Sequence, residues 1–226
     1  MVLRLLISIP KDLLIDRISS ININIMSFLS IDCSTNLGSL FIKIKNKTYS
    51  KVLQSDKYNN DLLMKKILDF FDESNTKFDD ITKIFVNQGP GGFSGLRGSL
   101  AVAKGISLSK NLNLYGYNTF IWQCVSFFNE KDFVYSLIKF RKKYYIKKFN
   151  QKLKSFPIIE EVTVSEIVKK YDNRIKTVSK NAIKDFDKKI LKLKNLNIVD
   201  LDHKELEFLQ LEGLLDERLI KPLYLT

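Results

Sequence analysis

Seven of the nine glycines in this 226-residue chain fall between Gly89 and Gly116. Most belong to the segment from Gln88 to Gly98, which joins an apolar run to a helical pattern. Glycine permits close backbone approach, and the free amides of a helix N-terminus can bind a phosphate. The segment has neither the Gly-Lys-Ser/Thr of a P-loop nor Gly-x-Gly-x-x-Gly spacing. We therefore favour a tight strand-to-helix turn, against which another element packs, over a phosphate site.

The residues available for metal, cysteine or histidine chemistry are few. His203 is the single histidine, and Cys33 and Cys124 are far apart in the sequence. These residues cannot supply a four-ligand thiolate knuckle, a two-histidine metal site or a disulfide framework. Ser94 stands at the start of a predicted helix, where a cap is a better interpretation than a nucleophile. The sequence thus predicts no metal, no catalytic residue in this chain and a reducing, cytoplasmic location.

The elements that must position these residues alternate between strands and helices. The patterns predict strands at 28–33, 37–45, 47–54, 81–86, 112–117, 133–139, 143–149 and 175–178. They predict helices at 61–71, 94–110, 118–128, 163–170 and 204–215. This order indicates an α/β protein with mixed sheets covered by helices. The second half restarts with strands, as a degenerate second copy of the same unit would.

One predicted helix carries a face of small residues. Ser94, Gly98, Ala101 and Gly105 follow one another at helical spacing. Glycine inside a soluble helix costs about 1 kcal/mol relative to alanine, so this face indicates close helix–helix contact. We interpret 94–110 as a docking helix that pairs with a partner together with the apolar stripe of 61–71, which includes Leu63 and Ile67.

The chain has a formal charge of +12, from 37 Lys and Arg against 25 Asp and Glu. Residues 1–113 carry 15 cations and 10 anions, and residues 114–226 carry 22 and 15, so the charge is spread along the chain. The stretch 139–148 interleaves cations and aromatics. In a hairpin, its aromatic rings would pack in the core and its lysines would lie in water. We expect at most a modest contribution to RNA binding from this stretch.

The first 26 residues do not resemble the start of the fold. The apolar run from Leu5 to Ile9 ends at Pro10, too short for a signal peptide, and no stretch approaches a membrane span. Our interpretation is that 1–26 is an extension and that Met26 is the natural start, the alternative being a short added helix. We expect no membrane association.

Three segments together resemble a known family. They are Phe28–Thr35 (FLSIDCST), Gly89–Arg97 (GPGGFSGLR) with the helix residues Ala101–Gly105, and the ending Pro222–Leu225 (PLYL). This combination is similar to TsaB, also called YeaZ, the accessory subunit of bacterial tRNA threonylcarbamoyladenosine synthesis. The likeness is weak between about 125 and 215. Gly92 stands where the family often has Ser, and Thr226 where the tail usually has Arg.

The resemblance implies an actin-like, sugar-kinase-like (ASKHA) fold of two RNase-H-like lobes, the second reduced. It implies a first lobe at 27–117, joined by the C-terminal helix and tail at 203–226, and a second lobe at 118–202. It also implies a non-catalytic partner of TsaD, which transfers threonylcarbamoyl to N6 of adenosine 37 in tRNAs reading codons that begin with A. The ATPase TsaE joins the complex, tRNA binds through it, and the free protein can form a homodimer. No intrinsic cofactor is implied, and ATP with Mg²⁺ would bind only in the complex.

The alternative is an actin-like ATPase or kinase. Asp32, Ser34 and Thr35 lie where such folds place a phosphate- and magnesium-binding hairpin, and the loop with Gly89, Gly91 and Gly92 would also contact the nucleotide. Ser34 replaces the usual glycine of that hairpin, and the second lobe shows no second phosphate-binding loop. We favour Asp32 as a structural carboxylate that accepts turn amides or pairs with Arg97. A nuclease of the same strand order would need further carboxylates where Asn87 and Gln88 stand, and no Cys–His or Ser–His pair supports a peptidase.

Overall fold

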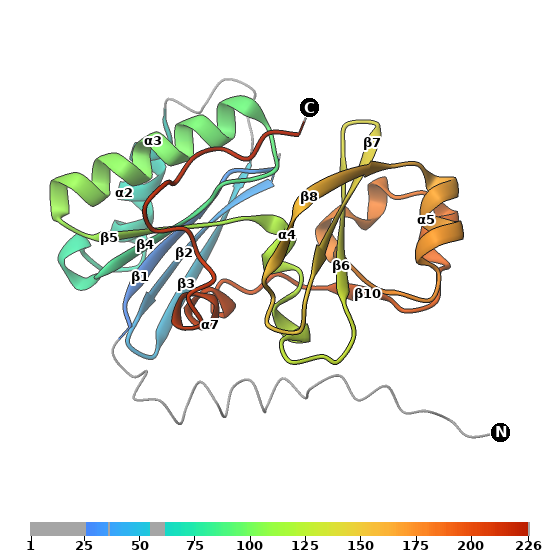
Figure 1. Cartoon of the computed structure of the whole chain (residues 1–226). Coiled ribbons are helices and arrows are strands. Elements are labelled where there is room, and N and C mark those ends of the chain that lie inside the picture. The colour runs from blue at the N-terminus through green and yellow to red at the C-terminus, as the bar shows by residue number, and fades with distance from the viewer. Residues whose placement is uncertain (1–25, 36, 55–61, 226) are drawn as a thin grey trace. The chain divides into compact units, whose positions relative to one another are not determined.

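The chain forms two compact units. The structure, a computed structural model, describes residues 26–35, 37–54 and 62–225. The first lobe consists of residues 26–119 with 202–225, and the second lobe consists of residues 120–201 (Figure 1). The proposed extension lies outside the described residues except for Met26. None of the helices in the described ranges has both the length and the apolar character needed to cross a bilayer.

The first lobe contains a five-stranded mixed sheet. Its strands are β1 (Phe28–Asp32), β2 (Leu37–Ile44), β3 (Lys47–Gln54), β4 (Lys83–Asn87) and β5 (Asn113–Tyr117), in the order β3-β2-β1-β4-β5. The pairs β1–β2 and β2–β3 are antiparallel, whereas β4 lies parallel to both β1 and β5. The carboxyl ends of β1 and β4 therefore meet at one edge, which brings Asp32 and Asn87 to the same end of the sheet.

The second lobe repeats that arrangement. Its strands are β6 (Val134–Phe140), β7 (Lys143–Phe149), β8 (Ser155–Val162), β9 (Ile175–Ser179) and β10 (Leu196–Val199), in the order β10-β9-β6-β7-β8. Here too the first three strands are antiparallel and the last two are parallel to the first. The two lobes thus share one strand order and one set of directions, which confirms the predicted α/β fold of two RNase-H-like lobes.

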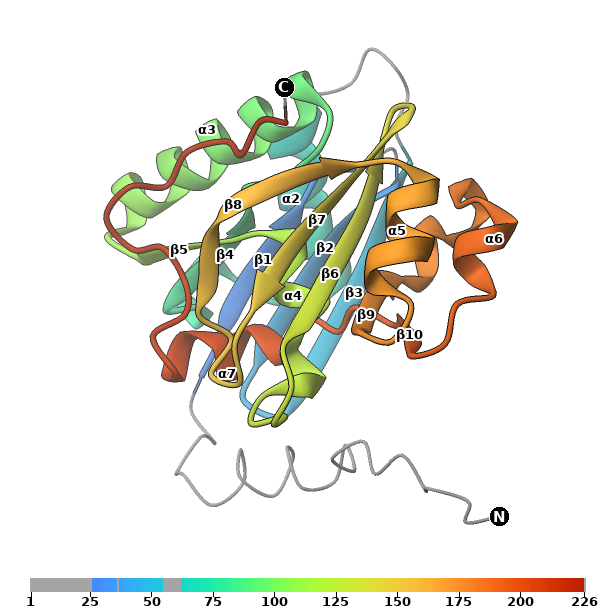
Figure 2. The same cartoon turned by 45° about the vertical axis from the view of Figure 1, so that its right-hand side comes forward.

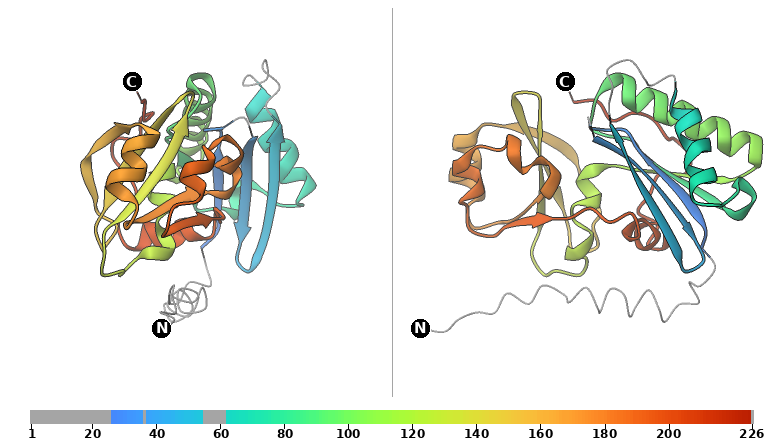
Figure 3. Two further views of the ribbon diagram at one scale, coloured as in Figure 1. Left: turned by 90° about the vertical axis from the view of Figure 1, so that its right-hand side faces the viewer. Right: turned by 180° about the vertical axis from the view of Figure 1, so that it is seen from behind.

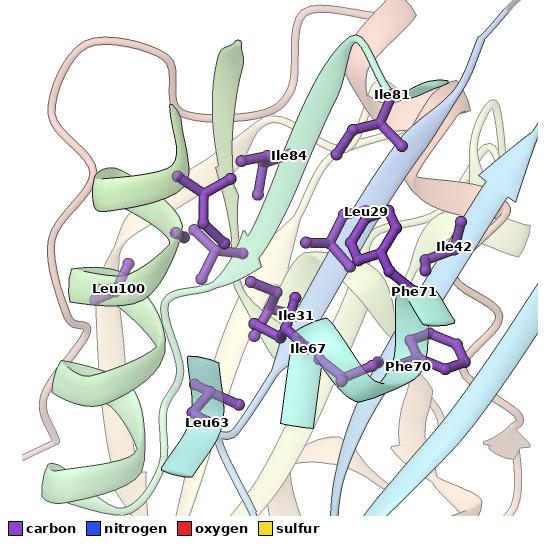
Figure 4. Packing of buried hydrophobic residues seen from close by; sticks show 14 of the residues in the cluster. Leu29, Ile31, Ile42, Leu63, Ile67, Phe70, Phe71, Ile81, Ile84 and Leu100 are labelled. Atoms are coloured by element: carbon purple, nitrogen blue, oxygen red, sulfur yellow. The ribbon is translucent and has the colours of Figure 1, made fainter. Parts of the chain in front are cut away.

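Helices cover both faces of the first sheet (Figure 3). On one face lie α2 (Leu63–Glu73) and α3 (Phe93–Lys110), and on the other lies α7 (Glu205–Leu211). Strand alternation explains this division, because Leu29 and Ile31 point to the α2 side while Ser30 faces the α7 side. Figure 4 shows the α2 side chains packed against that apolar face of the sheet.

α7 is fixed to the first sheet by polar contacts. The Lys43 ammonium forms an ion pair of 2.6 Å with Glu207, which is 2% exposed. The side chain of His203 is 8% exposed and stacks on the ring of Phe41. Its Nδ1 lies 2.8 Å from Ser30 Oγ and its Nε2 lies 3.0 Å from Ser39 Oγ. These contacts return the C-terminal segment to the first lobe.

The second lobe is reduced in its helices and not in its sheet. Its helices α5 (Val164–Tyr171) and α6 (Lys188–Leu191) lie on one face, where Ile167 and Ile190 enter the core (Figure 2). The predicted helix at 118–128 is wrong, because the chain there forms only α4 (Thr119–Trp122) and a 3-10 turn at Val125–Phe127. α5 begins with a capping box, since the side chains of Thr163 and Glu166 accept hydrogen bonds from each other's backbone amides.

A buried lysine binds main-chain carbonyl oxygens at the C-terminal end of α5. Lys176 is fully buried, and its ammonium donates to four main-chain carbonyl oxygens. They belong to Tyr171, Asp172, Arg174 and Lys194, at 2.6 to 2.9 Å. The carbonyls at the C-terminus of a helix attract positive charge. Lys176 therefore joins α5, the following turn and the approach to β10.

We predict that Lys176→Met destabilises the second lobe by about 2–4 kcal/mol, because it leaves buried carbonyls without donors. Urea unfolding measures the loss. The matched control is Lys169→Met, which changes an exposed position of α5 in the same way and is expected to alter stability by less than about 0.5 kcal/mol. Equal stability of the two variants would contradict the role of Lys176.

Candidate functional site

The glycine loop packs directly on the turn that follows β1. The Gly92 amide donates to the Ser34 carbonyl oxygen at 3.1 Å. A Cβ placed on Gly91 would lie 2.6 Å from the Ser34 carbonyl carbon, and one on Gly95 would overlap the Cys33 carbonyl oxygen. Side chains at these positions would displace main chain. The loop is thus the tight turn that we favoured from the sequence.

The polar groups at this edge of the sheet bond to one another. The Ser34 amide donates to the Asp32 carboxylate at 2.8 Å, and the Gly89 amide donates to Asn87 Oδ1 at 2.8 Å. Asn87 Nδ2 in turn donates to Ser34 Oγ at 3.3 Å and to Thr119 Oγ1 at 3.1 Å. Asp32 is therefore a carboxylate that accepts a turn amide, as expected.

The structure brings the six predicted phosphate residues to one place: Asp32, Ser34, Thr35, Gly89, Gly91 and Gly92. Ser34 is buried, whereas Thr35 and Gly92 are exposed. The amides of Ser34, Gly89 and Gly92 already donate to oxygens of the protein. A phosphate would have to compete with those bonds, so the arrangement favours structure over anion binding.

Burial shifts the pKa values of Cys33 and His203 in the first lobe, and of Cys124 in the second lobe, away from neutral pH. Burial, with a smaller effect of the Asp32 carboxylate, raises the pKa of the Cys33 thiol to about 12. Burial likewise raises the pKa of Cys124 to about 12 and lowers the pKa of His203 to about 4. Both thiols are protonated at pH 7, and His203 is neutral. Within the described ranges, no three His, Cys, Asp or Glu side chains gather as metal ligands would.

α3 exposes the face of small residues. Ser94, Ala101 and Gly105 are exposed and Gly98 is half-buried, while Leu96, Leu100 and Ile106 turn to the core. Next to this face Leu108 is 84% exposed. The helix begins at Phe93 and its N-cap is Gly92, so Ser94 is an exposed first-turn residue and not the cap that we predicted. An exposed apolar side chain beside a row of small residues is typical of a surface that contacts another protein.

The C-terminal tail runs beside α3 (Figure 1). It is held there because the Leu223 amide donates to the Gln88 carbonyl oxygen at 2.7 Å. Further along, Arg97 Nε donates to Tyr224 Oη at 2.9 Å, and the guanidinium lies 3.8 Å from the centre of the Phe93 ring. Arg97 thus binds the tail, and its predicted alternative pairing with Asp32 is wrong.

An open pocket of about 640 Å³ lies between α3 and this tail. Three cations line it, from Arg97, Lys104 and Lys221, around the small side chain of Ala101 and the ring of Pro222. Leu100 and Tyr224 complete the lining. The pocket borders the small-residue face, so that face and the pocket form one continuous surface, which we call the α3 surface.

The α2 residues predicted for partner contact lie elsewhere. Leu63 is 5% exposed and Ile67 is fully buried, and both belong to the core beneath the sheet (Figure 4). Periodicity identifies an apolar stripe, but it does not distinguish a stripe that faces the core from one that faces a partner. The exposed apolar side chains of this region are Leu62, Met64 and Leu68. The prediction for Leu63 and Ile67 is therefore corrected.

We predict that Gly91→Ala and Gly95→Ala each lower stability by about 2–3 kcal/mol, because a methyl group forces the loop away from the β1–β2 turn. Chemical denaturation tests this. Gly92→Ala and Gly105→Ala are matched controls, since a Cβ there meets no atom within 4 Å. Gly105→Ala should add up to about 1 kcal/mol to the helix. Normal stability of both loop variants would exclude the proposed packing constraint.

His203 makes the stability of the first lobe depend on pH. The pKa of His203 is about 4 in the folded protein, below its ordinary value of 6.5. Between pH 4 and 6.5, His203 is therefore protonated in the unfolded chain but neutral in the folded protein. The free energy of unfolding should be highest above about pH 6.5 and should fall by up to about 3 kcal/mol as the pH approaches 4. Denaturation across this range, compared with His203→Gln, measures the difference. An identical pH profile for both proteins would refute the assignment.

The comparisons with known proteins agree with the resemblance. The family model described as TsaD, tRNA N6-adenosine threonylcarbamoyltransferase, matches residues 54–136. A protein of Buchnera aphidicola subsp. Baizongia pistaciae, named tRNA threonylcarbamoyladenosine biosynthesis protein TsaB, is 35% identical over 88 residues. That match covers 38% of this chain and 39% of the relative.

Two solved structures share the fold. YeaZ from Pseudomonas aeruginosa superposes with a TM-score of 0.62 at 16% identity, covering 89% of this chain and all of that chain. A protein with similarity to peptidase YEAZ from Pseudomonas aeruginosa gives 0.64 at 15% identity with the same coverage. The chain is thus similar in sequence to a TsaB protein over 88 residues, and it shares the fold of the YeaZ structures over most of its length.

Proposed function

We propose that this chain is a non-catalytic partner subunit in tRNA threonylcarbamoyladenosine biosynthesis. It binds a TsaD-type transferase and supports transfer of threonylcarbamoyl to N6 of adenosine 37, in the cytoplasm. The name of the Buchnera relative and the TsaD family match support this pathway. TsaE, ATP with Mg²⁺ and tRNA join through the complex.

The observation that carries the proposal is the α3 surface. A long helix leaves Ala101 and Gly105 exposed, and its other face is already buried in the lobe. Small side chains let the backbone of a second helix approach closely. The cations of the adjoining pocket, Arg97, Lys104 and Lys221, suit a partner segment that bears carboxylates.

The second candidate function, an actin-like ATP-binding enzyme, has less support. The loop and hairpin that would bind the phosphates satisfy each other's amides and carbonyls. Calorimetry of the isolated chain with ATP and Mg²⁺ separates the two functions. A catalytic site should bind nucleotide without a partner, whereas the proposed subunit, measured alone, should show no heat of ATP binding.

We predict that Gly98→Leu and Ala101→Leu each abolish a stable complex with the TsaD-type protein, because a bulky side chain prevents close helix approach. The affinity should fall at least about 100-fold, as measured by calorimetric titration. Both positions lie away from the core, so thermal unfolding should change little.

The matched control is Lys169→Leu, which adds the same side chain to an exposed position of α5. It should bind as the original protein does. Full affinity of both α3 variants would contradict docking through this helix.

A further inference from the structure

The positive charge belongs almost entirely to one lobe. Residues 120–201 carry 19 Lys and Arg against 9 Asp and Glu, a net charge of +10. Residues 24–119 and 202–226 carry 15 against 14, a net charge of +1. Division of the sequence at its midpoint hides this contrast, because the acidic C-terminal segment belongs to the first lobe. A general drift toward lysine would raise both lobes alike.

The second lobe has too few carboxylates to neutralise these cations, with 9 Asp and Glu against 19 Lys and Arg. Carboxylates pair with Lys143, Lys170 and Lys180, and Lys176 is buried among carbonyls. Without the buried Lys176, an excess of nine positive charges must face solvent or a ligand. A field of this size attracts polyanions, and each phosphate contact adds affinity that decreases with salt.

The same lobe exposes aromatic rings around a lysine. Phe133 is 41% exposed and Phe156 is 39% exposed, with ring centres 5.7 Å apart and an edge-to-face orientation. The Lys148 ammonium lies 3.7 Å from the centre of the Phe133 ring and 4.5 Å from that of Phe156. Ile158, on the same strand face as Phe156, is 68% exposed. We call Phe133, Lys148, Phe156 and Ile158 the aromatic patch.

The aromatic patch adjoins two basic loops. The loop before β6 and the loop between β7 and β8 are joined, because the Asn129 amide donates to the Gln151 carbonyl oxygen at 2.7 Å. The Lys152 ammonium donates to Asn129 Oδ1 at 2.7 Å and lies 4.9 Å from the Phe128 ring centre. Lys131 and Lys154 of these loops are exposed. Cations and open rings thus lie at one end of the second sheet.

We infer that the second lobe itself binds RNA, with the aromatic patch stacking on unpaired bases and the surrounding lysines contacting phosphates. Rings that accept bases, combined with a positive groove or surface, are how proteins bind single strands. The choice of RNA over an acidic protein or an anionic membrane rests on the proposed function in tRNA modification. It goes beyond that proposal, which brings tRNA only through the complex.

The stretch 139–148 contributes less than its composition suggests. Tyr144 and Tyr145 are buried, as predicted for a hairpin. The Lys139 ammonium donates to the Asp185 carbonyl oxygen, and Lys143 pairs with Glu161 at 2.7 Å. Of this stretch, Lys148 is the residue that reaches the aromatic patch.

The test is fluorescence anisotropy of the full chain with a labelled tRNA transcript at several salt concentrations. Phe133→Ala and Phe156→Ala should each weaken binding about fivefold or more, while Phe156→Tyr keeps a ring and the affinity. Lys148→Ala and Lys152→Ala should each lower the salt slope by about 0.7–0.9. Thermal unfolding verifies that every variant is folded.

The matched controls lie in the first lobe. Phe93→Ala removes a ring that is 54% exposed, more than either ring of the aromatic patch, and Lys47→Ala and Lys65→Ala remove exposed cations. They should leave RNA affinity unchanged. Losses as large as those from the aromatic patch would overturn the inference, as would absent RNA binding or unaffected Phe variants. Equal competition by polyglutamate or by phosphatidylserine vesicles would also overturn it.

Complex formation with the TsaD-type protein is measured in parallel. Variants of the aromatic patch should still form the complex, because their changes lie outside the α3 surface. A complex without RNA contact by this lobe would refute the inference and leave the proposed function standing. RNA contact through the aromatic patch, without any complex with the TsaD-type protein, would support the inference and refute the proposed function.

Discussion

The packing of the glycine loop on the turn after β1 is the constraint on which the first lobe depends. Main chain meets main chain there, since Gly91 and Gly95 have no room for a Cβ beside Ser34 and Cys33. This contact sets where α3 begins and therefore which of its faces lies outward. It also occupies the amides that a phosphate would need. One local constraint thus accounts both for the exposed face of α3 and for loop amides that are already hydrogen-bonded to protein oxygens.

The two lobes share one strand order but differ in their helices and in their charge. Both sheets have three antiparallel strands followed by two parallel ones. In the first lobe, an 18-residue helix covers the sheet and offers its outer face, whereas the longest helix of the second lobe has 8 residues. The second lobe keeps a five-stranded sheet and concentrates the positive charge. The architecture therefore places the exposed face of a long helix in one lobe and the excess of positive charge in the other.

The sequence predicted the fold well where local signals, such as side-chain periodicity, glycine clusters and capping residues, determine the structure. The strands around Phe28, the glycine loop, α3 and the cap at Thr163 have strong local signals. The sequence analysis missed β8, which contains Pro157 and exposed apolar residues, and β10, which has 4 residues. It placed Leu63 and Ile67 on a partner surface because burial depends on tertiary packing. The role of His203 could not be predicted, since Ser30 lies 173 residues away. The role of Lys176 depends on how the end of α5 and the turn after it orient their carbonyls.

The central claim is that this chain acts by binding a TsaD-type protein. Light scattering on a sizing column tests it most directly, with the purified chain run alone and then mixed with the TsaD-type protein of the same organism. The account predicts a stable complex whose mass equals the sum of one copy of each protein or a multiple of that sum. Separate elution of the two proteins, with nucleotide and tRNA present, would contradict it.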